Sequence, residues 1–181
     1  PRIYKKDRIE VKKADQTETL FAVLVEWFDG YEEWHFQRRE VSTRAFLWDM
    51  RAGYRFLSES QTADTIRQAS CILTLYYDFE SARRIIPWHH GGGDFVVRAF
   101  DDSIDVRLIT ARGYQPIRSV EDKGVMEALC AFCVEVTTKM RLDKREGMGE
   151  STWADRFVVE AALEGFFEGL KIRQARGDTG L

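Results

Sequence analysis

The chain has 181 residues, of which 44% are hydrophobic and 31% are charged, a composition typical of one globular domain that buries its own core. A formal net charge of −3 and a pI near 5.7 leave no general basic surface for binding nucleic acid or anionic lipid. No apolar run approaches the roughly 20 residues of a membrane span, and the first residues contain no signal-peptide core. We therefore expect a single domain over 1–181 in the cytoplasm, without nucleic-acid or membrane partners. A first residue of Pro1 fits both removal of an initiator Met and a fragment of a longer chain that has additional domains.

The first 14 residues are rich in lysine and arginine, and we expect them to form a peripheral, solvated segment. After them, Asp15 and Glu18 stand at capping-box spacing, and apolar residues recur at helical intervals from Leu20 to Tyr31. This pattern predicts an amphipathic helix over 17–28.

Helical spacing of apolar residues continues through most of the remaining chain, and capping signals mark several of the expected helix starts. The tail over 174–181, which is rich in glycine and charge, is expected to be frayed. The expected helices are a short one around 34–36, one capped by Ser42 or Thr43 with Leu47, Met50, Tyr54 and Leu57 on one face, a central one over 62–79, one over 121–140, and a last one that opens at a capping box formed by Thr152 and Asp155.

One region changes its period. Residues 94–98 and 104–110 are strand-like runs joined by the turn Asp101-Asp102-Ser103, which predicts a central β-hairpin at about 94–110. The predicted fold class is therefore α+β and predominantly helical, with about five or six helices around one hairpin. Cys71, Cys130 and Cys133 all lie in apolar helical patterns, and we expect free, buried thiols.

The best candidate site is the turn that leads into this hairpin. His89 and His90, two of the three histidines, precede Gly91, Gly92 and Gly93, and Asp94 follows. Glycines let a ligand approach the backbone N–H groups, and imidazole transfers protons near neutral pH, so the pattern predicts a catalytic or binding site. The alternative is a glycine-rich turn in which the histidines satisfy buried carbonyl groups.

A metal site at this turn needs more ligands than the turn supplies. Asp94 could be joined by Asp105 or Glu80, whereas the third histidine, His35, lies far away in sequence. The chain contains no P-loop, no nucleophile elbow and no H-E-x-x-H motif, which argues against the activities that those motifs support.

A second candidate region is the polar segment Met140–Glu150, which lies between two expected helices. Arg141, Lys144 and Arg145 could clamp a phosphate or carboxylate, and Trp153 could form the floor of a pocket. Arg107, on the second strand of the hairpin, is counted with these ligand-binding candidates. The alternative is a solvated interhelical loop with internal ion pairs, followed by a tryptophan that packs against the helix start.

The order of helix 62–79, glycine-rich turn and hairpin resembles the C-terminal lobe of the aminoglycoside and choline phosphotransferases, which share the protein-kinase-like fold. In that family a catalytic loop H-G-D-x-x-x-x-N runs into a hydrophobic strand, and the next strand ends in a metal-binding Asp. His89 stands here at the position of the catalytic Asp, Asp94 at that of the Asn, and Thr110 at that of the metal-binding Asp. The resemblance implies that Asp94 holds Mg²⁺ and that His89 acts as a base, although both signature aspartates are absent.

Three functions from different classes follow from these patterns. The first is a divergent or degenerate phosphotransferase-like domain that binds a small phosphorylated or nucleotide ligand around the turn and the basic segment. The second is a non-catalytic helical scaffold or interaction protein whose tryptophans, such as Trp27, Trp34 and Trp48, include a partner or homodimer surface. The third is a metal-dependent hydrolase that uses His89, His90 and Asp94. An enzyme requires the glycine turn and the basic segment to meet in one concave pocket.

Overall fold

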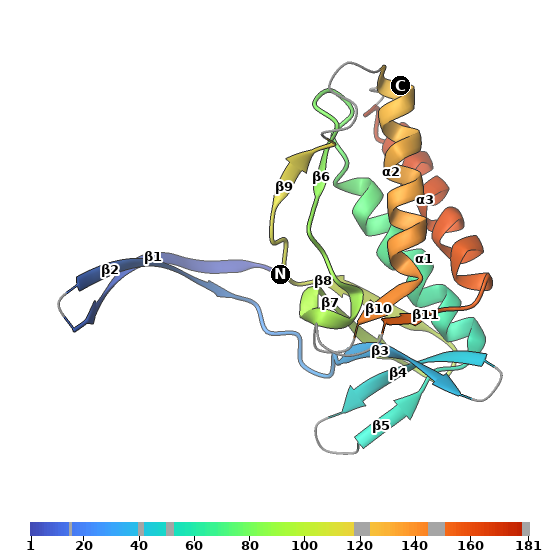
Figure 1. Ribbon diagram of the computed structural model, residues 1–181, viewed down its shortest axis with the longest axis horizontal. Coiled ribbons are helices and arrows are strands. Elements are labelled where there is room, and N and C mark those ends of the chain that lie inside the picture. The colour runs from blue at the N-terminus through green and yellow to red at the C-terminus, as the bar shows by residue number, and fades with distance from the viewer. Residues whose placement is uncertain (15, 40–41, 50–52, 118–123, 145–150, 179–181) are drawn as a thin grey trace. The chain divides into compact units, whose positions relative to one another are not determined.

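The computed structural model describes residues 1–14, 16–39, 42–49, 53–117, 124–144 and 151–178, in two compact units that comprise Pro1–Gly30 and Tyr31–Leu181 (Figure 1). In the described residues the chain forms three α-helices, one π-helical turn and eleven strands. The fold is α+β, but the prediction of a predominantly helical protein with five or six helices was wrong.

The first unit is an antiparallel hairpin of β1 (Ile3–Lys13) and β2 (Gln16–Val25). The helix predicted over 17–28 was wrong, because the continuous apolar run Leu20–Val25 satisfies strand and helix spacing alike. Threonine and valine are frequent in β2 and favour the strand. Glu18, expected in a capping box, pairs across the hairpin with Lys13 at 3.0 Å, and Asp15 lies outside the described residues.

The second unit begins with a three-stranded antiparallel sheet where two helices were predicted. Its strands are β3 (Glu33–Arg39), β4 (Ser42–Asp49) and β5 (Gly53–Phe56), in that spatial order. Trp34 and Phe36 are buried opposite Leu47 and Ala45. The helical spacing of Leu47, Tyr54 and Leu57 arises from residues of two strands and the segment that follows them, and Met50 lies outside the described residues.

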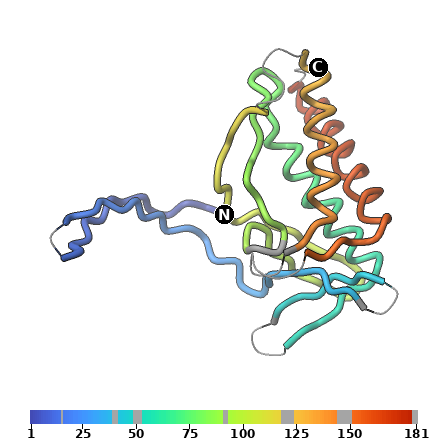
Figure 2. Tube along the Cα trace, in the orientation of Figure 1, coloured from blue at the N-terminus to red at the C-terminus, as the bar shows by residue number. Residues whose placement is uncertain are grey.

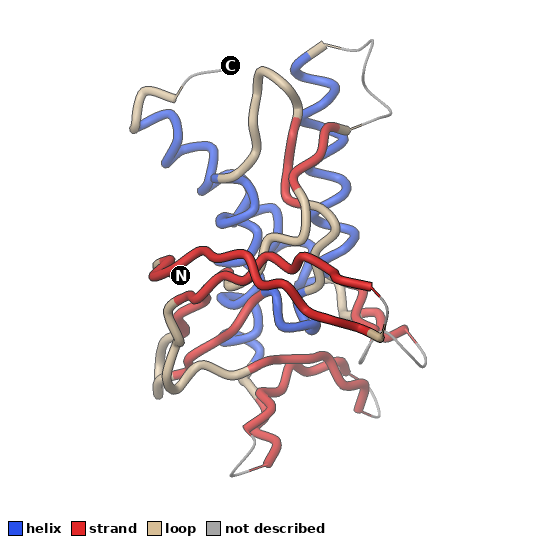
Figure 3. The backbone as a smooth tube through the Cα atoms, turned by 90° about the vertical axis from the view of Figure 1, so that its left-hand side faces the viewer, coloured by secondary structure: helices blue, strands red, loops and turns tan. Residues whose placement is uncertain are grey.

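The other strands form short two-stranded ladders that do not merge into one sheet in the described residues (Figure 3). Strand β7 (Phe95–Ala99) pairs with β8 (Ile104–Leu108), which confirms the predicted hairpin. The other pairs are β6 (Arg83–Ile85) with β9 (Tyr114–Pro116) and β10 (Leu142–Lys144) with β11 (Ser151–Trp153). Thr152 therefore belongs to a strand, and the capping box predicted at this position was wrong.

Three helices lie side by side in the second unit (Figure 2). They are α1 (Glu59–Leu75), α2 (Val125–Met140) and α3 (Phe157–Ala175), which confirm three of the predicted helices with shifted bounds. Helix α1 packs most extensively on α3, where Gly165 allows close approach: a Cβ there would lie 2.0 Å from the Arg67 carbonyl oxygen. None of these helices, within the described chain, is long and apolar enough to cross a membrane.

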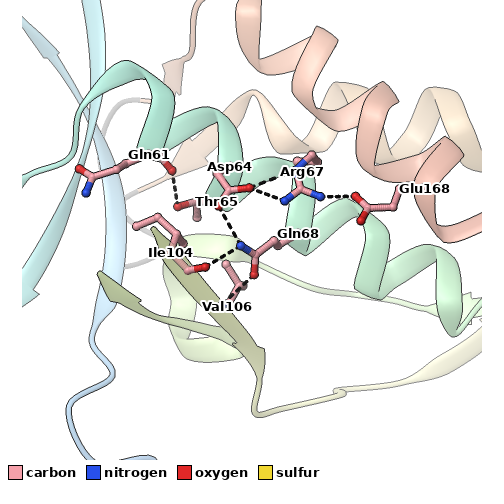
Figure 4. A network of polar contacts seen from close by, with 8 residues as sticks. All are labelled: Gln61, Asp64, Thr65, Arg67, Gln68, Ile104, Val106 and Glu168. Atoms are coloured by element: carbon pink, nitrogen blue, oxygen red, sulfur yellow. Dashed lines mark hydrogen bonds and ion pairs between the residues drawn. The ribbon is translucent and has the colours of Figure 1, made fainter. Parts of the chain in front are cut away.

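Polar side chains of α1 connect it to the β7–β8 hairpin and to α3 (Figure 4). The Gln68 amide donates to the Ile104 carbonyl oxygen at 2.7 Å and accepts the Val106 N–H at 3.1 Å, so one side chain pairs with the backbone of β8. On the other side, Arg67 forms ion pairs with Asp64 and Glu168. Helix α1 is therefore held between the β7–β8 hairpin and α3.

All three cysteines are free, as expected, but they are not all buried. Cys71 is buried, Cys133 is half-buried and Cys130 is exposed on α2. Burial raises the pKa of the thiols of Cys71 and Cys133, which keeps both protonated and unreactive at neutral pH.

Candidate functional site

The glycine-rich turn is a single π-helical turn, His90–Asp94, that leads directly into β7. Gly93 has a positive φ of 73°, and a Cβ at this position would lie 2.7 Å from Glu33 Oε1. The positive φ favours glycine at this residue, whereas the flexible end of the Glu33 side chain can move aside for a Cβ. Turns of this type are frequent at functional sites, which keeps the predicted position of interest.

Asp94 is fully buried and its carboxylate is engaged by two donors. Arg112 Nε donates to Oδ1 and Oδ2, both at 2.9 Å, and the backbone N–H of His89 donates to Oδ2 at 2.8 Å. The carboxylate of Asp94 raises the pKa of Arg112 through this hydrogen bond and through charge attraction. Asp94 thus closes the turn on itself and ties it to the segment after β8.

His90 is buried with only 2% of its surface exposed, and it packs against aromatic rings. Its ring stacks on Trp34, with centroids 4.7 Å apart, and meets the edge of Phe36 at 5.4 Å. Among the described residues, neither ring nitrogen has a hydrogen-bond partner, and the same holds for Trp34 Nε1. Burial lowers the pKa of His90 to about 4, although the nearby Asp143 carboxylate opposes the shift, so the ring is neutral at pH 7.

Asp143 brings the distant His35 to the same region. One carboxylate oxygen of Asp143 accepts the backbone N–H of Phe36 at 2.7 Å and lies 3.3 Å from His35 Nδ1. Burial alone would raise the pKa of Asp143, but the hydrogen bonds from His35 and from the backbone N–H of Phe36 lower the pKa. His35 and Asp143 are both buried, on β3 and β10.

The two regions predicted from sequence therefore do meet, but through a residue that was not predicted. Asp143 belongs to the polar segment Met140–Glu150, and β10 contacts the π-turn. Sequence reasoning missed Asp143, Arg112 and the approach of His35. No sequence pattern marks Asp143, because alternation with Leu142 predicts an outward carboxylate, whereas Asp143 is buried and Leu142 is exposed.

The cationic ligand-binding candidates are used elsewhere or fall outside the described residues. Arg107 pairs with Asp105 at 2.8 Å, and Arg141 Nε donates to the Ala154 carbonyl oxygen at 3.0 Å and lies over the Trp153 ring. Lys144 lies in β10 opposite Ser151, and Arg145 is outside the described residues. His89, next to the buried His90, is exposed.

The geometry does not fit the magnesium site that the resemblance implies. Both oxygens of Asp94 already accept hydrogen bonds, and the cationic Arg112 lies where a second cation would have to bind. In the described chain, no group of three histidine, cysteine or acidic side chains is arranged to hold a metal ion.

A cavity of about 260 Å³ lies elsewhere, between β4 and the starts of α1 and α3. Thr43, Ser58 and Asp155 line it, and Asp155 accepts the backbone N–H of Thr43 at 2.9 Å. None of the candidates His89, His90, Asp94, Arg107, Arg141 and Trp153 is among its lining residues.

Comparison of the chain with protein-family models, with curated proteins and with solved structures finds no match.

We predict that His90 makes stability depend on pH between about 4 and 6.5. In this window the unfolded chain binds a proton at His90 and the folded chain does not, so the free energy of unfolding falls as the pH falls. The difference amounts to about 3 kcal/mol for a pKa lowered from 6.5 to about 4. Urea unfolding of wild type and His90→Gln across this range measures it, with the exposed His89→Gln as control. Equal pH slopes in wild type and His90→Gln would show that the ring is solvated.

We also predict that Arg112 stabilises the folded protein by neutralising the buried Asp94 carboxylate. Arg112→Met leaves the buried Asp94 carboxylate without its cation and should lower the free energy of unfolding by more than the loss of an exposed ion pair does. Arg107→Met removes an exposed pair and should cost less than about 1 kcal/mol. Similar losses for the two variants in chemical unfolding would contradict a closing role for Asp94.

Proposed function

We propose that this protein is a non-catalytic interaction protein whose hairpin, formed by β1 and β2, binds another protein chain. The observation that carries the proposal is the exposure of large apolar side chains over this unit. Phe21 is 75% exposed and Trp27, which follows the hairpin, is 85% exposed. The other exposed large apolar side chains of the unit are Ile3, Tyr4, Ile9, Leu20, Val23, Leu24 and Val25.

A two-stranded hairpin has no means of covering such side chains itself. The hairpin is a single layer, so apolar side chains on either of its faces stay in water unless another surface packs on them. Burial of one such side chain contributes about 1.5–3 kcal/mol, so a set of this size represents a strong driving force for association. Contiguous apolar surface of this kind marks interaction sites in soluble proteins.

The contacts in the glycine-rich turn support the same assignment. Asp94 is closed by Arg112, and His90 is enclosed by Trp34 and Phe36, so two of the three candidate catalytic side chains serve the packing of the second unit. His89, the third, is exposed. The phosphotransferase-like and metal-dependent functions stay predictions. The element order α1, turn, β7 and β8 is the one that the former implies, but both oxygens of the Asp94 carboxylate, which would hold the metal ion, already accept hydrogen bonds.

The proposal predicts that protein binding depends on the hairpin. The chain is immobilised and exposed to an extract of its source cells, to which untagged copies of the same chain are added. The wild-type chain should retain at least one protein that the double variant Phe21→Ser, Trp27→Ser does not retain. Phe167→Ser removes a similarly exposed aromatic from α3 and is the matched control. The recovery should fall about tenfold or more for the hairpin variant, the effect of losing one anchor side chain of an interface, and stay unchanged for the control.

Identical sets of retained proteins for wild type and the hairpin variant, with untagged copies of the chain absent from both, would overturn the proposed function. A loss of recovery that is equal for Phe167→Ser would move the interaction surface to the second unit.

A further inference from the structure

The two strands of the hairpin differ sharply along their open edges. Each strand of a two-stranded sheet has one edge whose backbone groups are unpaired within the sheet. In β1, seven of the eleven residues are charged, from Lys5 to Lys13. In β2 the run Leu20–Val25 carries no charge. Charged side chains are a common protection of strand edges against pairing with another chain, so β1 is a protected edge and β2 is an open one.

The open edge has the composition of a strand that pairs with another strand. Leu20–Val25 is a run of six apolar residues without glycine or proline, and three of them, Phe21, Val23 and Val25, favour extended backbone. An incoming strand at this edge would pair with the free N–H and C=O groups, and its side chains would pack beside those of β2 on each face of the sheet.

We propose that the occupant of this edge is a second copy of this chain, whose β2 pairs antiparallel with β2 of the first. This inference rests on the proposed function of the hairpin. The resulting sheet has four strands in the order β1, β2, β2 of the partner subunit and β1 of the partner subunit. Three or more strands are needed for a sheet of this kind to be stable in water, and a second copy supplies them.

The apolar run is complementary to itself. An antiparallel pair with its twofold axis at Ala22 places Leu20 opposite Leu24 of the partner subunit and Phe21 opposite Val23 of the partner subunit. No charged side chains meet within this run, and the smallest side chain lies on the axis. The charged β1 strands form the two outer edges, so the assembly closes at two copies and does not extend into a fibre.

Leu20 and Ile9 allow a matched test. They lie directly opposite each other in the hairpin, so they share a face, and they are 44% and 48% exposed. Sedimentation velocity over a range of protein concentrations measures the dissociation constant of the dimer. Leu20→Lys places a charge on the paired edge and should raise this constant about 30-fold or more, whereas Ile9→Lys, on the outer strand, should change it less than about threefold.

The outcomes of this test separate the inference from the proposed function. Equal weakening by the two substitutions would replace edge pairing by packing of hairpin faces and overturn the inference. A wild-type chain that is monomeric at all concentrations also overturns it. If hairpin-dependent capture of a different protein persists in that case, the proposed function stands, and if capture is lost as well, both fail.

A cross-link tests the register independently of any charge. In a background with Cys130→Ser and Cys133→Ser, the variant Ala22→Cys should form a disulfide-linked dimer on mild oxidation, because the two copies of residue 22 lie opposite each other. Asp7→Cys is the control, since Asp7 lies directly opposite Ala22 within the hairpin but on the charged strand. Cross-linking of Asp7→Cys that equals or exceeds that of Ala22→Cys would contradict pairing through β2.

Discussion

Two strands alone cannot form a hydrophobic core, and this constraint governs the first 30 residues. Leucine, valine and phenylalanine side chains occupy both faces of β2, and no second layer of the described part of this unit covers them. Burial elsewhere is the one way to recover the free energy of hydrating these groups. In the function that we propose, the hairpin is half of an interface. The charges of β1 then acquire a role, because they decide which edge of the hairpin is free to pair.

The second unit is organised by buried polar groups that connect separate short ladders. Asp94 ties the π-turn to Arg112 after β8, and Asp143 ties β10 to the backbone of β3. His90 lies near Asp143 and is stacked on Trp34. Because no continuous sheet joins these strands in the described residues, such contacts and the aromatic packing hold the elements in register. The concentration of histidine, glycine and aspartate in one turn thus has a structural explanation.

The sequence predicted the secondary structure correctly where the local apolar spacing and the tertiary environment favoured the same element. Helices α1, α2 and α3 and the β7–β8 hairpin were predicted, because their apolar spacing is long and unambiguous. The strands of the first 56 residues were not. Leu20–Val25 satisfies helical and strand spacing equally, and its partner strand β1 was read as a solvated basic segment because alternation there is masked by charge. Pairing across a turn decides such segments, and single-sequence periodicity does not report it.

The candidate site shows the same limit. The position of the turn was predicted from its residues. Arg112 and Asp143, however, lie 18 and 49 residues from Asp94 in sequence, and His35 lies 55 residues from His90. No spacing rule brings such residues together. The burial of His90 and the closure of Asp94, which move the functional assignment from the turn to the hairpin, were therefore visible only in the structure.

Hydrogen exchange of the backbone amides in the hairpin is the most direct test of the account. Exchange of the amides in Leu20–Val25 is followed at a protein concentration well above and well below the dimer dissociation constant, with the amides of β1 as internal reference. The account predicts that amides on the outer edge of β2 are protected at high concentration and lose protection on dilution, whereas amides on the outer edge of β1 exchange fast at both. Exchange in Leu20–Val25 that does not depend on concentration, with no protection of its outer edge, would contradict it.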